Sequence, residues 1–308
     1  MAPPEIVPFA DEHLDGAVRL LAERHARHRE VEPLLPADAE LGDQLERERG
    51  ELAGTVALEA GEVVGYLLGT RREDQIGPHV WSYIAGHAVR DPELVRDLYA
   101  ASAEAWVDAG LTRHFVYVPA VPELVDPWFR LSFGASAALA IREAEPQPAV
   151  DGGVAIRESS RDDVGAAVRL DRHQFESMLG SPSFSRNEPP EEEALAAEWA
   201  EVWDDPEAHR HFVAERDGAI VGHILLYRRP SDLRVPADSI DLADASTLPE
   251  ARGSGVGLAL THHVLGWAHE HGYTTMTIDW RMTNLLASRF WPRRGFRETF
   301  LRLYRSIP

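Results

Sequence analysis

The stretch Arg252-Gly253-Ser254-Gly255-Val256-Gly257 determines how this sequence is interpreted. It follows an apolar segment that ends at Leu248-Pro249, and it precedes an amphipathic run over 258–270. A glycine-rich turn that opens a helix leaves several backbone N–H groups without partners inside the helix. Together with the positive end of the helix dipole, these donors favour a phosphate group, and Arg252 adds a permanent cation. We therefore expect a phosphorylated cofactor at this turn.

Other phosphate-binding motifs do not fit the sequence. No G-x-G-x-x-G follows a first strand, so a dinucleotide-binding fold is disfavoured. The Gly-Lys-Ser/Thr of a P-loop is also missing. The class of cofactor must therefore be inferred from what surrounds the turn.

Composition narrows the class of protein. The chain has 308 residues, about twice a typical domain, which predicts two domains. A net charge of −20 argues against nucleic acid as a partner and favours a cationic small molecule. The absence of cysteine excludes disulfides, thiolate metal sites and cysteine nucleophiles.

The sequence says less about the cellular location and the oligomeric state of the protein. No apolar run approaches the roughly 20 residues of a membrane span, and the first residues lack the apolar core of a signal peptide. We expect a cytoplasmic protein without membrane contact. The histidines near 262–271 show no zincin-type pairing with a carboxylate, so no metal site is expected. The oligomeric state is left open, a homodimer included.

The chain consists of two copies of one pattern. The stretch 56–65 parallels 212–222, and each predicts a strand, a tight turn and a strand. Each half is predicted to run β-α-β-β-β-α-β-α-β, which is a mixed α/β layout. The Pro- and Gly-containing stretch 144–153 predicts a linker, with domains over 1–148 and 149–308. We expect each domain to be a twisted mixed sheet flanked by helices.

Long insertions precede the central hairpins, over 30–49 and 181–209. The second insertion contains Trp199 and Trp203, which are four residues apart on a predicted helix. This spacing places both rings on one face of the helix. A packed helix face is favoured over a substrate platform.

The second half carries two motifs at matching places. The order of elements, with the glycine turn between the fourth strand and its helix, resembles the GNAT superfamily of acyl-CoA-dependent N-acyltransferases. The family's cofactor signature, Arg/Gln-x-x-Gly-x-Gly/Ala, is matched by Arg252, Gly255 and Gly257. A second signature follows the fifth strand and is matched by Asn284, Ala287, Trp291, Gly295 and Phe296. The resemblance covers 154–308, whereas the first half matches only in its order of elements.

The resemblance implies acetyl-CoA as the cofactor and a small-molecule amine, favoured as a cation by the net charge, as the substrate. The turn would hold the pyrophosphate, and the edge of the fourth strand would hold the pantetheine arm. The Leu248 N–H would polarise the thioester carbonyl, and Asn284 would contact the arm. The expected cofactor-binding residues are Ser246, Thr247, Leu248, Arg252, Gly253, Ser254, Gly255, Val256, Gly257, Asn284 and Trp291.

The proton donor differs from the family pattern. Many relatives have tyrosine at the position of Trp291, where its hydroxyl protonates the leaving thiolate. An indole N–H is not a useful acid near neutral pH. Ser288, one helical turn before Pro292, is the alternative donor, and its ordinary interpretation is a surface residue of the helix.

A base is needed because an amine must lose its ammonium proton before it attacks. Asp241 and Asp244 lie in the predicted strand over 239–247, three residues apart and hence expected on opposite faces. We favour Asp244, which is nearer the thioester, and interpret Asp241 as a solvated strand residue. His223, in the preceding strand, either reaches the cleft or is structural.

The first half lacks the cofactor turn. At the equivalent place it has Asp91-Pro92-Glu93, in which Asp91 is expected to cap the helix and use its free N–H groups. We interpret the first domain as a degenerate copy. The function expected is acetyl transfer from acetyl-CoA to a primary amine by direct attack. The alternative is an acyl-CoA-binding sensor or scaffold whose catalysis has decayed.

Overall fold

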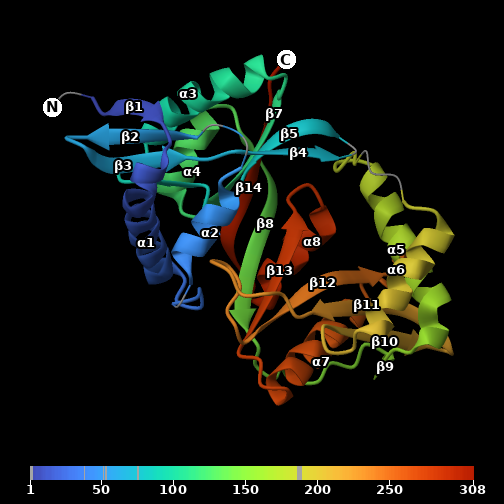
Figure 1. The fold of residues 1–308 in the computed structure, drawn as a ribbon. Coiled ribbons are helices and arrows are strands. Elements are labelled where there is room, and N and C mark those ends of the chain that lie inside the picture. Colours follow the sequence, from blue (N-terminus) through green and yellow to red (C-terminus); the bar gives the residue numbers. More distant parts are fainter. Residues whose placement is uncertain (1–2, 38, 51, 53, 75, 186–188) are drawn as a thin grey trace. The chain divides into compact units, whose positions relative to one another are not determined.

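The computed structural model describes residues 3–37, 39–50, 52, 54–74, 76–185 and 189–308. The chain forms two compact units (Figure 1). The first comprises 1–139, 231–236 and 298–308, and the second comprises 140–230 and 237–297. The predicted boundary at 148/149 divides the sequence into its two copies. The compact units are divided differently, because the last strand belongs to the first unit.

The described residues of the first unit contain strands of two sheets and the helices α1 to α4. Its strands are ordered β1-β2-β3-β6 in one sheet and β4-β5-β7-β14-β8 in the other. The bounds are β1 (Glu5–Pro8), α1 (Leu14–Val31), α2 (Leu41–Glu48), β2 (Thr55–Glu59), β3 (Glu62–Leu67), β4 (Thr70–Asp74), β5 (Gly77–Ser82), β6 (His87–Val89), α3 (Leu94–Asp108), β7 (Arg113–Pro119), α4 (Pro122–Arg130), β8 (Gly134–Glu143) and β14 (Arg297–Ser306). The hairpin β4–β5 has no counterpart in the predicted pattern.

The last strand of the chain pairs with the first half of the sequence. Residues of β14 run antiparallel to β7, with Phe300 opposite Pro119 and Ser306 opposite Arg113. The Phe300 side chain is fully buried and packs against Leu35 and Leu139. This burial explains why the C-terminal strand belongs to the first unit.

The described residues of the second unit contribute neighbouring strands of a larger sheet, with helices on both faces. Its strand order is β13-β12-β11-β10-β9. The bounds are β9 (Ala155–Glu158), α5 (Val164–Leu179), α6 (Glu192–Asp204), β10 (His209–Arg216), β11 (Ala219–Tyr227), β12 (Ser239–Thr247), α7 (Val256–Glu270), β13 (Thr275–Arg281) and α8 (Leu285–Phe290). The mixed α/β fold class is confirmed. Within the described residues, no helix combines the length and apolarity that a membrane span requires.

Neighbouring residues of β10 identify the helices on each face of this sheet. The His211 ring lies 4.7 Å from the Trp199 ring of α6, whereas the Phe212 ring lies 5.5 Å from the Trp267 ring of α7. Because successive side chains of a strand point to opposite faces, α6 and α7 cover different faces. Helices α5 and α6 lie side by side on the first face (Figure 1). Trp199 and Trp203 both belong to the hydrophobic cluster there, which confirms the packed helix face.

The sheet of the second unit opens between its two parallel strands. Strand β12 pairs with β13 only from Ser239 to Leu242. Strand β12 nevertheless continues beside β11 as far as Thr247. On that side Leu226 lies opposite Leu242 and Leu225 opposite Asp244, so Ala243 is an extra residue, a β-bulge. The edge of β12 over 243–247 is therefore not paired with β13.

We predict that Phe300→Ala lowers the free energy of unfolding by about 3–5 kcal/mol, because it leaves a cavity in a fully buried position. The control is Phe129→Ala, since that side chain is 48% exposed and should cost far less. Urea unfolding followed by fluorescence measures both. Equal losses of unfolding free energy in the two variants would show that Phe300 does not contribute the core packing described for β14.

Candidate active site in the second unit

The glycine turn has the geometry that a phosphate site requires. Gly253 and Gly255 have φ of +74° and +91°, a left-handed conformation that favours glycine. The first hydrogen bond of α7 runs from the Ala259 N–H to the Gly255 carbonyl, at 2.9 Å. No side chain caps the helix, and the described residues provide no hydrogen-bond partner for the N–H groups over 253–258. These donors are therefore available to a ligand.

Two guanidinium groups lie at this turn. The Arg252 Nε donates to the Thr247 carbonyl at 3.1 Å, and its Nη2 lies 3.1 Å from His173 Nε2. Arg216, which the sequence did not single out, donates to Ser254 Oγ at 2.9 Å. It reaches the turn from β10, so only the pairing of the strands brings it there. Both cations would favour an anionic group at the turn.

At the corresponding helix start of the first unit, the N–H groups over 93–96 already have partners among the described residues. The Glu93 N–H donates to Asp91 Oδ1 at 3.0 Å, so Asp91 uses a donor just before the helix, but the residue that precedes α3 is Glu93 and the predicted N-cap position at Asp91 is wrong. The next three N–H groups, at 94–96, donate to the carbonyls of Asp91, Pro92 and Glu93. Since the donors before α3 are already used and Asp91 adds negative charge, this helix start disfavours a phosphate.

The strand edge differs from the prediction at Leu248. Its N–H donates to the Val221 carbonyl at 2.9 Å, so the expected role of this group toward a thioester carbonyl is wrong. Positions along an antiparallel pair alternate between bonded and non-bonded. The Thr247 N–H therefore points away from β11, toward the open edge. A Cβ added at Gly257 would lie 3.8 Å from Thr247 Oγ1, so the edge and the turn are adjacent.

The other predicted cofactor residues have structural contacts of their own. Ser246 Oγ donates to the Leu170 carbonyl at 3.3 Å. The Asn284 Oδ1 caps α8 by accepting the N–H groups of residues 286 and 287, which leaves its NH2 group for a ligand. The Trp291 side chain is buried, with rings 4.8 and 5.6 Å away at Phe290 and Phe296. Ser288 is half-buried on α8. Their roles toward a ligand stay predictions.

The bulge also changes where the two aspartates point. Asp241 lies opposite Tyr227 and Asp244 opposite Leu225, and these two partners share a face of β11. Both aspartates therefore lie on the face covered by α5 and α6, and the prediction of opposite faces is wrong. The extra residue, Ala243, shifts the alternation by one position.

Asp241 is an internal anchor rather than a solvated residue. Its carboxylate accepts hydrogen bonds from Arg229 Nε at 2.7 Å and from Thr277 Oγ1 at 2.6 Å. The residue is 4% exposed. A guanidinium and a hydroxyl group therefore occupy this buried carboxylate, which makes Asp241 part of the internal hydrogen-bond network rather than a free base.

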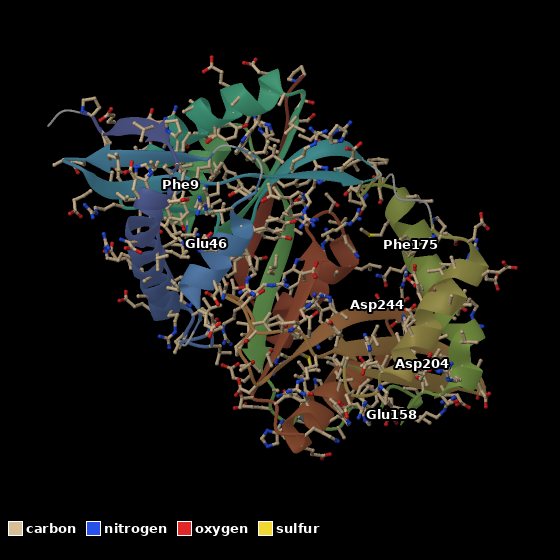
Figure 2. All side chains as sticks on the ribbon, viewed as in Figure 1. Phe9, Glu46, Glu158, Phe175, Asp204 and Asp244 are labelled. Carbon is tan, nitrogen blue, oxygen red and sulfur yellow. The ribbon has the colours of Figure 1, made fainter. Side chains whose placement is uncertain are left out.

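Asp244 has the environment of a base. Its side chain is 17% exposed, and Figure 2 labels it on β12. Burial raises the pKa of Asp244 to about 6, although hydrogen bonds from Gln174 and from the Ala245 N–H favour the ionised form. A carboxylate with this pKa is mostly ionised at pH 7.5 and is a stronger base than an exposed aspartate.

A second carboxyl group lies near Asp244 on α5. Burial, and next the charge of Asp244, raise the pKa of Asp171 to about 6. The Trp199 Nε1–H donates to Asp171 Oδ2 at 3.3 Å. The sequence did not identify Asp171, because its position near β12 follows only from the packing of α5 on the sheet. Two such carboxyl groups would attract a cationic substrate.

Comparison with known proteins agrees with this geometry. Residues 174–296 match the model of the Acetyltransferase (GNAT) family. An uncharacterized N-acetyltransferase of Mycobacterium tuberculosis is 32% identical over 110 residues, which span 66% of that relative and 36% of this chain. The segment over 174–296 therefore resembles the GNAT family, and the chain spans just under two thirds of the length of that relative. This GNAT segment contains the turn, the open edge and Asp244.

Solved structures support the GNAT fold over the whole chain. A GCN5-related N-acetyltransferase from Sphaerobacter thermophilus has a TM-score of 0.61 at 16% identity, covering 98% of this chain and 95% of that one. A tandem GNAT protein from the clavulanic acid biosynthesis pathway has a TM-score of 0.53 at 15% identity, covering 98% of both chains. At these identities the likeness concerns the fold alone.

We predict that Asp244→Asn raises the free energy of unfolding at pH 7.5 by about 1–3 kcal/mol. The pKa of this carboxyl rises from 3.8 to about 6 on burial, so above pH 6 the folded state bears the cost of an ionised, desolvated group. The gain should shrink as the pH falls through 6 and vanish below about 4, where both states bind the proton. Thermal unfolding against pH measures it.

The control is Asp108→Asn, since that side chain is exposed and its replacement should change little. A destabilised Asp244→Asn protein at pH 7.5 would contradict the raised pKa.

Proposed function

We propose that this protein transfers an acetyl group from acetyl-CoA to a primary amine, with one active site in residues 154–308. The observation that carries the proposal is the adjacency of two features in the second unit. One is the set of N–H donors at 253–258 without partners in the described residues, and the other is the unpaired edge of β12 over 243–247. The match to the GNAT family model supports this assignment.

Each part of acetyl-CoA has a complementary group. The turn, Arg252 and Arg216 would hold the pyrophosphate through N–H and guanidinium donors. The pantetheine arm contains amides and would pair with the β12 edge. The Thr247 N–H would donate to the thioester carbonyl. When bound, acetyl-CoA supplies a thioester carbonyl carbon that an amine can attack without a covalent enzyme species.

The chain must also remove a proton from the amine. Asp244 would accept it, because the ionised carboxylate lies on the strand that carries the open edge. On attack the nitrogen must lose one of its two remaining protons, since the amide keeps the other, and the leaving thiolate must gain one to become the thiol. Ser288 on α8 is the proposed donor, since the Trp291 indole cannot serve as an acid.

The substrate class follows from charge. Asp171 and Asp244 are partly desolvated carboxyl groups near one another, and the chain carries a net charge of −20. Both favour an amine that arrives as a cation. The N-acetyltransferase relative of M. tuberculosis supports an amine acceptor in general terms.

We predict that Gly255→Asp and Arg252→Glu each weaken acetyl-CoA binding at least tenfold, or about 1.4 kcal/mol. The first forces a left-handed backbone on an acidic residue, and the second reverses the charge beside the pyrophosphate. The control is Arg90→Glu, an exposed arginine just before the equivalent helix of the first unit. Calorimetry measures all three, and unchanged affinity in both site variants would refute the cofactor assignment.

We predict that Asp244→Asn lowers kcat by about 10²–10⁴-fold and leaves acetyl-CoA affinity unchanged. In the wild type, kcat/KM should fall as the pH drops below about 6, because Asp244 then binds a proton. Thioester consumption with spermidine, kanamycin, lysine and a basic peptide measures the rate. Binding of acetyl-CoA with no turnover on any amine would favour the second candidate function, an acyl-CoA sensor. The buried Trp291 supports this candidate, because an indole stands where a proton donor is expected.

A further inference from the structure

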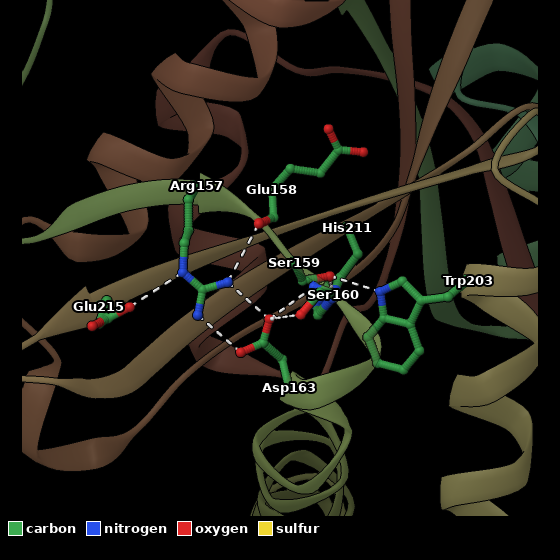
Figure 3. A network of polar contacts seen from close by, with 8 residues as sticks. All are labelled: Arg157, Glu158, Ser159, Ser160, Asp163, Trp203, His211 and Glu215. Carbon is green, nitrogen blue, oxygen red and sulfur yellow. Dashed lines mark hydrogen bonds and ion pairs between the residues drawn. The ribbon is translucent and has the colours of Figure 1, made fainter.

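A chain of buried and half-buried polar groups leads to Asp244 through the second unit. The Trp203 Nε1–H donates to Ser159 Oγ at 3.0 Å, and Ser159 Oγ lies 2.7 Å from His211 Nδ1 (Figure 3). The His211 Nε2 lies 2.9 Å from His223 Nδ1. The His223 Nε2 in turn lies 3.4 Å from Asp244 Oδ2. Apart from Asp244, the steps of the proposed acetyl transfer do not use the residues of this chain.

Both imidazole rings are neutral inside the protein. His211 is 3% exposed and His223 is 0% exposed, and the Trp199 ring lies 4.7 and 5.5 Å from them. Burial lowers the pKa of His211 to about 2 and that of His223 to about 4. A neutral imidazole has one N–H donor and one acceptor nitrogen. Each ring therefore donates a hydrogen bond on one side and accepts one on the other.

Trp203 and Asp244 fix that direction. An indole N–H can only donate, so it uses Ser159 as an acceptor, and the hydroxyl proton is directed at His211 Nδ1. The His211 Nε2–H then donates to His223 Nδ1, and the His223 Nε2–H faces the Asp244 carboxylate. The opposite direction would place a nitrogen lone pair against the ionised carboxylate, which is repulsive.

Other charged groups act on the same cluster from the packed elements. Asp171 on α5 disfavours a second negative charge, and Gln174 on α5 donates a hydrogen bond to Asp244. Glu198 on α6 acts on Asp171. Asp163, which is paired with Arg157 (Figure 3), favours a proton on His211. From β11, His223 Nε2 faces Asp244 at 3.4 Å, a contact of charge and dipole, and it has no hydrogen-bond partner among the described residues.

We propose that His223, His211 and Ser159 are positioning residues that keep the Asp244 carboxylate ionised, with Trp203 setting the direction of the hydrogen-bond chain. This proposal rests on the role of Asp244 as the base. It requires no proton transfer along the chain. Its effect is to make Asp244 ready for the ammonium proton of the substrate despite burial and the neighbouring Asp171.

A pH–rate profile tests the chain. Trp203→Phe keeps an aromatic ring but removes the N–H, and Ser159→Ala removes the hydroxyl. Each should raise the acidic midpoint of kcat/KM by about 0.5–1 pH unit, because it weakens the contacts that favour the Nε2–H tautomer of His223, whose N–H dipole favours the ionised form of Asp244. Acetyl-CoA affinity should not change, and Ser159→Thr should restore the midpoint. The matched control is Trp267→Phe, on the face covered by α7.

A second measurement is independent of activity. In the ligand-free protein with ¹⁵N-labelled histidine, long-range ¹H–¹⁵N correlation distinguishes the two tautomers. At pH 8 both His211 and His223 should be Nε2–H tautomers, with their signals assigned through His211→Gln and His223→Gln. In the wild type the His223 signals should shift near pH 6, where the adjacent Asp244 binds a proton. This shift should be absent in Asp244→Asn.

Two results would overturn the proposal: an Nδ1–H tautomer at either ring, or an acidic midpoint unmoved in both Trp203→Phe and Ser159→Ala. If the midpoint is unmoved while acetyl transfer proceeds, the chain is refuted and the proposed function stands. If no amine is acetylated, the tautomers alone decide whether the chain exists, and the proposed function is what fails.

Discussion

The parallel pairing of β12 with β13 ends after Leu242, and the candidate site depends on this end of the ladder. Beyond it, β12 keeps β11 as a partner on one side only, so one edge of backbone donors and acceptors is open. Arg252 already uses the Thr247 carbonyl of this edge, which ties the strand to the glycine turn. Because the bulge at Ala243 lies at the same place, the opening also sets where Asp244 points.

The role proposed for Asp244 illustrates how the requirement for a base opposes stability. A carboxylate that is a good base near neutral pH must be partly desolvated, and desolvation costs free energy in the folded state. The protein limits this cost with donors from Gln174, the Ala245 N–H and, in our proposal, His223. Asp241, three residues earlier on the same face, has Arg229 as a full cationic partner and shows the structural alternative.

Much of the fold followed from residue types and their order. The glycine turn, the hydrogen bond from the Glu93 N–H to Asp91 and the packed Trp199–Trp203 face are local features, so the sequence contains their physical cause. Hydrogen-bond register is not local. Because of the bulge at Ala243, the two aspartates lie on the same face of β12 and not on opposite faces. The alternation of bonded positions along β12 leaves the N–H of Thr247, and not that of Leu248, directed at the open edge.

Contacts between residues that are distant in the sequence could not be predicted either. The pattern of β14 predicts a strand but not its pairing with β7, which places the C-terminus in the first unit. The His211–His223 contact joins neighbouring strands diagonally, and Asp171 approaches Asp244 only through helix packing. A polar residue at alternate positions of two adjacent predicted strands is the signal that would have revealed the histidine pair.

The most direct test of the central claim is a crystal structure of the protein with CoA bound. We expect the pyrophosphate within hydrogen-bond distance of the N–H groups over 253–258, and the pantetheine arm along 243–247 with an amide or carbonyl at the Thr247 N–H. A pyrophosphate bound away from this turn, or an arm that leaves the β12 edge free, would contradict the assignment of the site.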